Sequence, residues 1–174
     1  IGGHELTRLI LPSMRRAGAG RIINCSSVLG LVSASYRGAY CASKFAMEAL
    51  SDAMRLELAG TGIHISLIEP GPITSRFRAN SYLAYQRYIR PETSRFAAVY
   101  AKQEQRLQHE GAVAPFTLGP EAVLACVIHA LESQHPKPRY RVTRPSHALA
   151  LLRRLLSTRH LDRVLLAIGG REAR

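Results

Sequence analysis

Three side chains that could carry out proton transfer stand at fixed spacings in the first part of the chain. Tyr40 and Lys44 are four residues apart, and Ser27 lies thirteen residues before the tyrosine. Residues four apart share one face of a helix, so the lysine ammonium would stand beside the phenol and favour its ionised form. The serine hydroxyl could hold a carbonyl or alcohol oxygen against that phenol. The spacing therefore predicts a general acid–base site of the kind that hydride transfer between a carbonyl and an alcohol requires.

The elements around these residues should bring them to one edge of a sheet. Strand, helix and strand in succession form a βαβ unit, so we expect a parallel sheet with a right-handed crossover. Gly18 and Gly20 precede a strand rather than follow one, which excludes them as a phosphate-binding loop. Apolar periodicity predicts helix 3–17, strand 21–25, helix 39–59, and strand 64–69, which ends at Pro70-Gly71-Pro72.

The second half of the chain combines an aromatic-rich segment with a leucine-rich end. Residues 74–118 hold seven of the eleven aromatic side chains, and a long segment after a strand is typical of a lid over a site. A helix over 121–133 and a short strand at 139–142 should follow. We expect a single domain over 1–174, with a substrate lid at 74–118 and C-terminal amphipathic helices at 146–168.

Four motifs together resemble the short-chain dehydrogenase/reductase family. The family pattern is a serine, twelve further residues and then Tyr-x-x-x-Lys, which this chain matches. The resemblance implies that Tyr40 is the general acid/base, that Ser27 orients the substrate oxygen, and that Lys44 assists the tyrosine and binds the nicotinamide ribose. Ser26 is the alternative serine, although the spacing favours Ser27. The motifs are Leu11-Pro12-x-Met14, Gly20-Arg21-Ile22-Ile23-Asn24-Cys25-Ser26-Ser27, Tyr40-Cys41-Ala42-Ser43-Lys44 and Pro70-Gly71-Pro72-Ile73.

The turn at 70–73 is the expected seat of the nicotinamide. The resemblance places backbone groups of Ile73 on the carboxamide and a hydroxyl for the phosphates at Ser75, with Thr74 as the alternative. Independently of the family, ligands of open α/β sheets lie beyond the carboxyl ends of the strands, where this turn falls. The predicted cofactor-binding residues are Tyr40, Lys44, Pro70, Gly71, Ile73 and Ser75.

The resemblance covers nearly the whole chain, as roughly the C-terminal two thirds of such an enzyme. We therefore expect an α/β fold with a Rossmann-like doubly wound parallel sheet, present as its C-terminal part only, with the cofactor half missing before Ile1. On that expectation the isolated chain is a catalytically dead fragment. The nearest likeness is to bacterial aldehyde reductases close to the retinol- and 17β-hydroxysteroid-dehydrogenase-like branch. It implies NADP as the cofactor, with NAD as the alternative.

The expected partners are a small apolar substrate and further copies of the chain. The aromatic lid favours an apolar aldehyde, ketone or matching alcohol. The family commonly forms homodimers or homotetramers through the helices at 3–17 and 39–59. The second helix carries a stripe of alanines, beside which we expect Ser51 to be exposed. The alternative is that the stripe packs on the subunit's own sheet. Its members are Ala42, Ala46, Ala49 and Ala53.

Most of the net charge of +12 falls after residue 70, and such a surface could attract cofactor phosphates, nucleic acid or anionic lipid. No nucleic-acid motif accompanies it, so we expect no nucleic-acid partner. Binding of a basic amphipathic segment to a membrane surface remains the alternative function. The scattered Cys25, Cys41 and Cys126 indicate buried thiols and a cytoplasmic protein, with or without membrane association, and no metal site.

Overall fold

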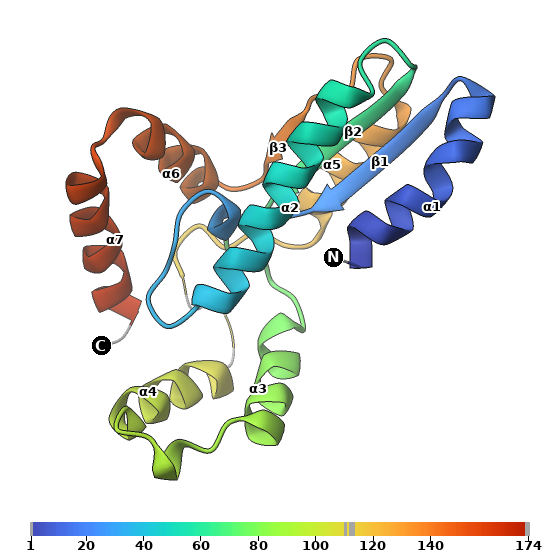
Figure 1. Ribbon diagram of the computed structural model, residues 1–174. Helices are drawn as coiled ribbons and strands as arrows, with labels where there is room; N and C mark the ends of the chain where they lie inside the picture. The colour runs from blue at the N-terminus through green and yellow to red at the C-terminus, as the bar shows by residue number, and fades with distance from the viewer. Residues whose placement is uncertain (1, 110, 112–113, 173–174) are drawn as a thin grey trace.

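The computed structural model of the protein describes residues 2–109, 111 and 114–172. In this part of the chain a parallel three-stranded sheet has the order β1-β2-β3, and helices cover both of its faces (Figure 1). The elements are α1 (Gly2–Ala17), β1 (Gly20–Cys25), the 3₁₀ turn η1 (Val28–Gly30), α2 (Gly38–Glu57), β2 (Ile63–Glu69), α3 (Phe77–Tyr88), the 3₁₀ turn η2 (Pro91–Thr93), α4 (Ala97–Gln108), α5 (Glu121–Glu132), β3 (Arg139–Arg141), α6 (Arg144–Leu155) and α7 (Thr158–Glu172).

Alternate residues of the strands divide the core between the two faces of the sheet. Ile22 packs in a cluster with side chains of α1 and α2, whereas its neighbour Ile23 packs with side chains of α5. The same alternation places Ile65 on the first face and Ile68 on the second. A strand with apolar side chains on both faces reads as a continuous apolar run, which is why β1 and β2 could be recognised in the sequence.

The two crossovers of the sheet have opposite hands. The chain moves across the sheet in one direction, from β1 to β2 to β3, but α2 covers one face and α5 the other (Figure 1). Two parallel connections that advance in the same direction on opposite faces cannot share a hand. The right-handed rule therefore holds for only one of the two connections.

Two glycine turns precede β1 and β2, at the amino-terminal ends of the strands, opposite the site. Gly18 and Gly62 both have positive φ angles, of 64° and 75°. A Cβ atom on Gly62 would lie 2.2 Å from the carbonyl oxygen of Gly18, so the two turns can meet only without a side chain there. This contact aligns β1 with β2 from Gly20 and Ile63 onward, and their pairing ends at Cys25 and Ile68, one residue before the end of β2.

The expected lid contains two helices. Figure 1 shows α3 and α4 side by side beyond the carboxyl end of β1, away from the helices that cover the sheet. The hydroxyl of Tyr82 in α3 joins them, because it accepts a hydrogen bond from Nε2 of Gln108 in α4 at 2.6 Å. Residues 110, 112 and 113 of the expected lid lie outside the described residues.

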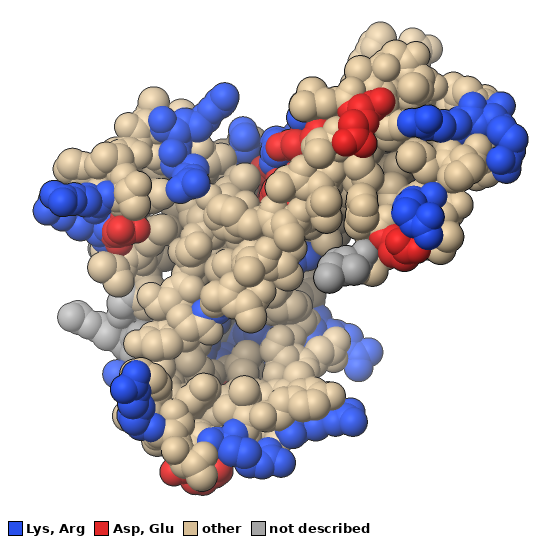
Figure 2. Space-filling model, viewed as in Figure 1, with Lys and Arg blue, Asp and Glu red and all other residues tan. Residues whose placement is uncertain are grey.

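Two basic helices, α6 and α7, end the described chain where one or two amphipathic helices were expected. Ala150 and Leu161 are buried, whereas other leucines of the pair stand in solvent. In Figure 2, lysine and arginine side chains gather over these helices and around α3 and α4, and acidic side chains lie over α2. Within the described ranges, no helix has the length and apolar character needed to span a bilayer.

Candidate active site

The first two site residues occupy the first turns of α2, at the carboxyl end of β1. Lys44 donates a hydrogen bond from Nζ to the carbonyl oxygen of Cys25, the last residue of β1, at 2.8 Å. The same ammonium lies 5.7 Å from the centre of the Tyr40 ring. The helix therefore brings phenol and ammonium onto one face, as the spacing predicts, and the hydrogen bond to Cys25 fixes that face against the strand end.

Ser27 follows β1 directly and begins the 3₁₀ turn η1. Its Oγ accepts a hydrogen bond from the amide of Leu29 at 3.1 Å, which leaves the hydroxyl proton to be donated elsewhere. The neighbouring Ser26 is 4% exposed. Its side chain lies close to Glu48 of α2, because a Cβ atom on Gly30 would touch the side chains of both Ser26 and Glu48. The two adjacent serines thus have different surroundings, and only Ser27 caps the turn.

The turn after β2 is attached to the serine loop. The amide of Val28 donates to the carbonyl of Pro70 at 2.8 Å. Gly71 lies under the start of α6, where an added Cβ would be 2.2 Å from Oγ1 of Thr143 and 2.9 Å from Oγ of Ser146. Both of those side chains are fully buried. Gly71 is therefore required by a close approach of α6 to the turn.

The backbone of Ile73 is arranged to bind a polar group. Ile73 forms a parallel bridge with Leu118, and the bridge is made by the carbonyl of Pro72 and the amide of Thr74, at 3.2 and 2.8 Å. In a parallel bridge the groups of the central residue point the other way, so the N–H and C=O of Ile73 face away from Leu118. One donor and one acceptor side by side suit a carboxamide, so the residues present fit the nicotinamide that the resemblance implies.

Ser75 has a role that the sequence did not predict. Its Oγ accepts a hydrogen bond from the amide of Phe77 at 3.3 Å and so stabilises the start of α3. The side chain is exposed. The aromatic ring of Phe77 packs edge-on against the ring of Tyr40, with centroids 5.8 Å apart and an interplanar angle of 65°. The first helix of the expected lid therefore touches the expected acid/base.

A buried ion cluster next to this site was missed in the sequence. Glu48 lies one turn beyond Lys44 on α2 and is 6% exposed, and Glu69, at the end of β2, is fully buried. Arg139 of β3 bonds to both carboxylates. A signal was present, because an acid at the end of an apolar strand needs a buried partner, but the partner is far away in the chain.

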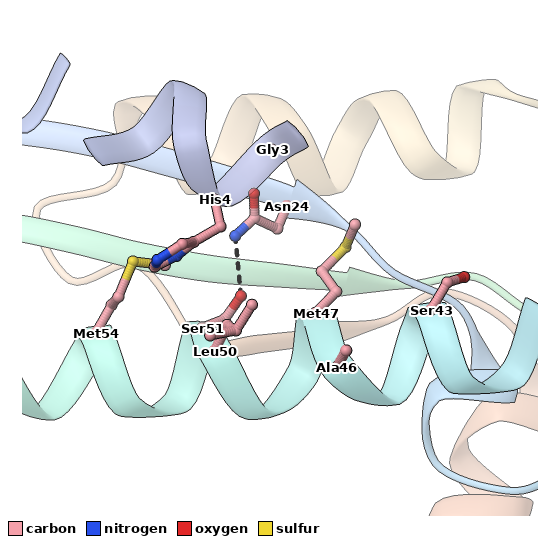
Figure 3. A pocket seen from close by; sticks show the side chains of 9 residues that line it. All are labelled: Gly3, His4, Asn24, Ser43, Ala46, Met47, Leu50, Ser51 and Met54. Atoms are coloured by element: carbon pink, nitrogen blue, oxygen red, sulfur yellow. Dashed lines mark hydrogen bonds between the residues drawn. The ribbon is translucent and has the colours of Figure 1, made fainter. Parts of the chain in front are cut away.

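A separate small pocket of about 60 Å³ lies between α1 and α2, and its lining is mainly apolar (Figure 3). Asn24 of β1 enters it and donates a hydrogen bond to Oγ of Ser51 at 2.9 Å. Ser51 is 1% exposed, so the expectation that it lies in solvent beside the alanine stripe is wrong. The alanines themselves, Ala42, Ala46, Ala49 and Ala53, are exposed.

The cysteines do not form a common environment. Cys41 is buried, Cys126 is half-buried, and burial raises the pKa of its thiol. Cys25 is exposed, so the expectation of buried thiols is wrong for this residue. Within 2–109, 111 and 114–172, no three His, Cys, Asp or Glu side chains are grouped closely enough to hold a metal ion.

Comparison with known proteins identifies the family. The family model described as short chain dehydrogenase matches residues 2–86, which include the Ser27, Tyr40 and Lys44 set and the turn after β2. The chain is 45% identical over 165 residues to YbbO, an uncharacterized oxidoreductase of Escherichia coli (strain K12), with 95% of this chain and 55% of that protein covered. The chain belongs to the short-chain dehydrogenase/reductase family.

Other members of this NAD(P)-dependent family show the same likeness. Retinol dehydrogenase 16 of Homo sapiens is 36% identical over 150 residues, which are 80% of this chain and 45% of that protein. A short-chain dehydrogenase/reductase from Burkholderia phymatum, solved with NAD, is 26% identical with a TM-score of 0.65, over 91% of this chain and 53% of that one. The chain spans about half the length of the relatives that it matches.

A structure from Burkholderia cenocepacia J2315, in complex with NADP, supports the fold alone. It is 20% identical with a TM-score of 0.66, over 95% of this chain and 56% of that one. The α/β, Rossmann-like parallel sheet is therefore shared with known members of the family. Both nicotinamide cofactors occur among these structures.

The family match corrects one prediction about the fold. We expected only the C-terminal part of a doubly wound sheet, with the cofactor half missing. The family model instead matches residues 2–86, the N-terminal, cofactor-binding part of this chain, so the restriction to a C-terminal part is wrong. The physical reason is that residues at the carboxyl ends of β1 and β2 belong to the cofactor-binding part, because ligands of such sheets lie at those ends.

Proposed function

We propose that this protein transfers a hydride between NADP(H) and an apolar aldehyde or ketone, or the matching alcohol. The observation that carries the proposal is the placement of Tyr40 and Lys44 on one face of α2 at the end of β1, with the hydroxyl of Ser27 on the loop that leaves the same strand. Membership of the short-chain dehydrogenase/reductase family supports the class of reaction.

The side chains divide the work of proton transfer. In the reducing direction, Tyr40 gives its phenolic proton to the carbonyl oxygen of the substrate. The Ser27 hydroxyl donates a hydrogen bond to the same oxygen, without transferring its proton, and so holds that oxygen at the phenol, while Oγ stays anchored by the amide of Leu29. The Lys44 ammonium stabilises the phenolate that is left when the proton has moved. The nicotinamide, when bound, supplies or accepts the hydride.

The cofactor would be held by the end of β1 and by the turn after β2. Lys44 would bind the ribose, and the N–H and C=O of Ile73 would bind the carboxamide. Pro70 and Gly71 shape this turn, and Ser75, two residues beyond Ile73, would supply a hydroxyl for the phosphates, with Thr74 as the alternative. We propose NADP because the resemblance of the motifs to bacterial NADP-dependent aldehyde reductases implies it. NAD is the alternative, since a family member that is 26% identical to this chain was solved with NAD.

The substrate is proposed to be apolar because the ring of Phe77 already covers one side of Tyr40. The segment that supplies this ring, 74–118, would act as the lid. The likeness to retinol dehydrogenase 16 supports an apolar alcohol or aldehyde as the substrate class. A cytoplasmic site of action is part of the same proposal.

The test is NADPH oxidation with a series of aliphatic and aromatic aldehydes and with retinal, with NADH in parallel. Tyr40→Phe should lower kcat by about 10²–10⁴-fold, the usual range for loss of a general acid. Tyr36→Phe is the matched control, because this phenol is 70% exposed and four residues before Tyr40, and it should leave kcat unchanged. A Tyr40→Phe protein with the kcat of the wild type would rule the assignment out.

A second function is suggested by the exposed leucines between arginines in α6 and α7. Leu151, Leu155 and Leu166 are each more than half exposed, and arginines alternate with them along both helices. We propose that these helices also make peripheral contact with anionic membrane surfaces, with the leucines toward the acyl chains.

A further inference from the structure

Five charged side chains from α2, β2 and β3 form one cluster directly behind the candidate site, and Arg55 of α2 pairs with its Asp52. Arg139 of β3 reaches three carboxylates, through Nη1 to Glu69 at 2.6 Å, through Nη2 to Asp52 at 2.5 Å, and through Nη1 to Glu48. Arg141 adds an ion pair to Glu69 at 3.3 Å. Arg139 therefore connects the middle of α2 to the ends of β2 and β3.

One end of this cluster reaches the serine loop. Oε1 of Glu48 and Oγ of Ser26 are both buried, and a Cβ on Gly30 would lie 3.2 Å from the first and 2.8 Å from the second. Neither atom has a hydrogen-bond partner within the described part of the chain. Oε1 is thus left to receive the Ser26 hydroxyl, whereas Oε2 is held by Arg139.

Glu48 lies on the same face of α2 as the proposed reacting residues. Glu48 stands four residues after Lys44 and eight after Tyr40, so all three lie along one face of the helix. Ser26 immediately precedes Ser27. A bond between Glu48 and Ser26 therefore connects the element that carries the phenol to the loop that carries the orienting hydroxyl.

We propose that Glu48 is a positioning residue: held by Arg139, its carboxylate fixes Ser26 and thereby the loop that presents Ser27 to Tyr40. This inference rests on the proposed function for its catalytic consequence. Its structural part, the ordering of residues 26–30 by Glu48, is independent of any activity.

The charge balance of the cluster predicts how this link depends on pH. Burial raises the pKa of Glu48, the Ser26 hydroxyl lowers it, the negative charge of Glu69 raises it further, and Arg139 lowers it. A protonated Glu48 no longer needs the hydroxyl as a donor, so the link weakens as pH falls through this raised pKa. The charged groups clustered with Glu48 are Asp52 of α2, Glu69 of β2, and Arg139 and Arg141 of β3, and Lys44 lies one turn earlier on α2.

Glu48→Gln is the informative variant because it reverses one hydrogen bond. The amide oxygen must face Arg139, which can only donate, so the NH₂ group faces Ser26 Oγ in place of an acceptor. We expect kcat to fall about tenfold, with KM for NADPH within about twofold of the wild type, because the loss is one of orientation. The acid limb that Glu48 contributes to the pH profile of kcat should disappear.

Ser26→Ala and Glu57→Gln complete the kinetic test. Ser26→Ala should reproduce the loss of kcat, and the double variant with Glu48→Gln should lose no more than either single one, because both changes act on the same link. If Glu48→Gln fails to fold, Ser26→Ala alone carries the test. Glu57→Gln removes an exposed acid from the end of the same helix and should match the wild type.

Hydrogen exchange separates this proposal from the proposed function. Peptides covering 25–32 should exchange at least about fivefold faster in Glu48→Gln and Ser26→Ala than in the wild type and Glu57→Gln, while peptides from α5 stay unchanged. If exchange changes in this way but the wild type turns over none of the substrates, the proposed function is rejected and the role of Glu48 in ordering residues 26–30 is kept. Unchanged exchange at 25–32, whatever happens to kcat, would overturn the role of Glu48.

Discussion

Single atoms decide several features of the candidate site. Lys44 is directed by one hydrogen bond to the end of β1, and Ser27 is oriented by the amide of Leu29. Gly71 is needed because α6 leaves no room for a Cβ. At this scale the site depends on the direction of single hydrogen bonds and on spaces too small to hold one methyl group.

Gly71→Ala should destabilise the protein. The new methyl group would displace Thr143 and Ser146, which are fully buried at the start of α6, and crowding of a packed site costs about 1–3 kcal/mol. Urea unfolding measures the loss. Gly38→Ala is the control, because a Cβ there meets nothing within 4 Å, and its free energy of unfolding should not fall. Equal stability of the two variants would show that the turn can move away from α6.

Glu48 should also make stability depend on pH. Its pKa in the folded protein is raised, mainly by burial, so the folded state binds this proton more tightly than the unfolded chain does. The contribution to stability is full below the ordinary carboxyl pKa and is lost as pH rises through the raised one. The free energy of unfolding of the wild type relative to Glu48→Gln should therefore increase between about pH 7 and about pH 4. A constant difference across that range would contradict the assignment.

At the scale of elements, α2 connects three parts of the molecule. One face packs on the sheet through Met54 and Leu58, a second carries the site and the ion cluster, and a third is open. The alanine stripe lies on the open face, so the alternative that it packs on the subunit's own sheet does not describe this chain. Small exposed side chains allow another helix to approach closely, so we propose that α2 joins copies of the protein.

Ala46→Arg should shift the protein toward the monomer in sedimentation experiments. The new side chain would place charge and bulk in the middle of the exposed stripe, next to the pocket between α1 and α2 (Figure 3). Ala125→Arg, at an exposed alanine of α5, adds the same charge elsewhere and should leave the oligomer intact. A wild type that stays monomeric at all concentrations would end the proposal.

The whole molecule is strongly basic, with a net charge of +12, and this charge is unevenly placed. Acidic side chains concentrate over α2, where the ion cluster neutralises arginines, whereas α6 and α7 keep theirs in solvent (Figure 2). Such a distribution can attract both the phosphates of a nicotinamide cofactor and anionic lipid headgroups.

The protein should sediment with vesicles that contain anionic lipid at low salt and be released at about 0.5 M salt, where charges are screened over a few ångström. Vesicles of neutral lipid alone should bind little. Replacing Arg153 and Arg154 by glutamate should abolish the sedimentation, while the same replacement at Arg15 and Arg16 of α1 should have less effect. Equal losses in the two double variants would indicate attraction by net charge alone.

Local patterns were enough to predict the strands and helices around the site and the residues that we propose to react, but not the helices α3 and α4. Tyr40 and Lys44 share a face because a helix repeats every 3.6 residues, and β1 and β2 were recognisable because both of their faces are apolar. The family could be recognised for the same reason, since its motifs are short and contiguous. These properties depend on neighbours in the chain, which a sequence displays directly.

Only the tertiary structure decided what lies behind the site. Glu48 meets Arg139 across 91 residues, and Gly71 meets Thr143 because α6 returns to the turn after β2. Ser51 is buried because Asn24 reaches it from β1, although its place on α2 suggested exposure. These contacts depend on which faces pack together and on how the chain crosses the sheet. Periodicity within one element specifies neither, so partners distant in the chain become visible only when the elements are assembled.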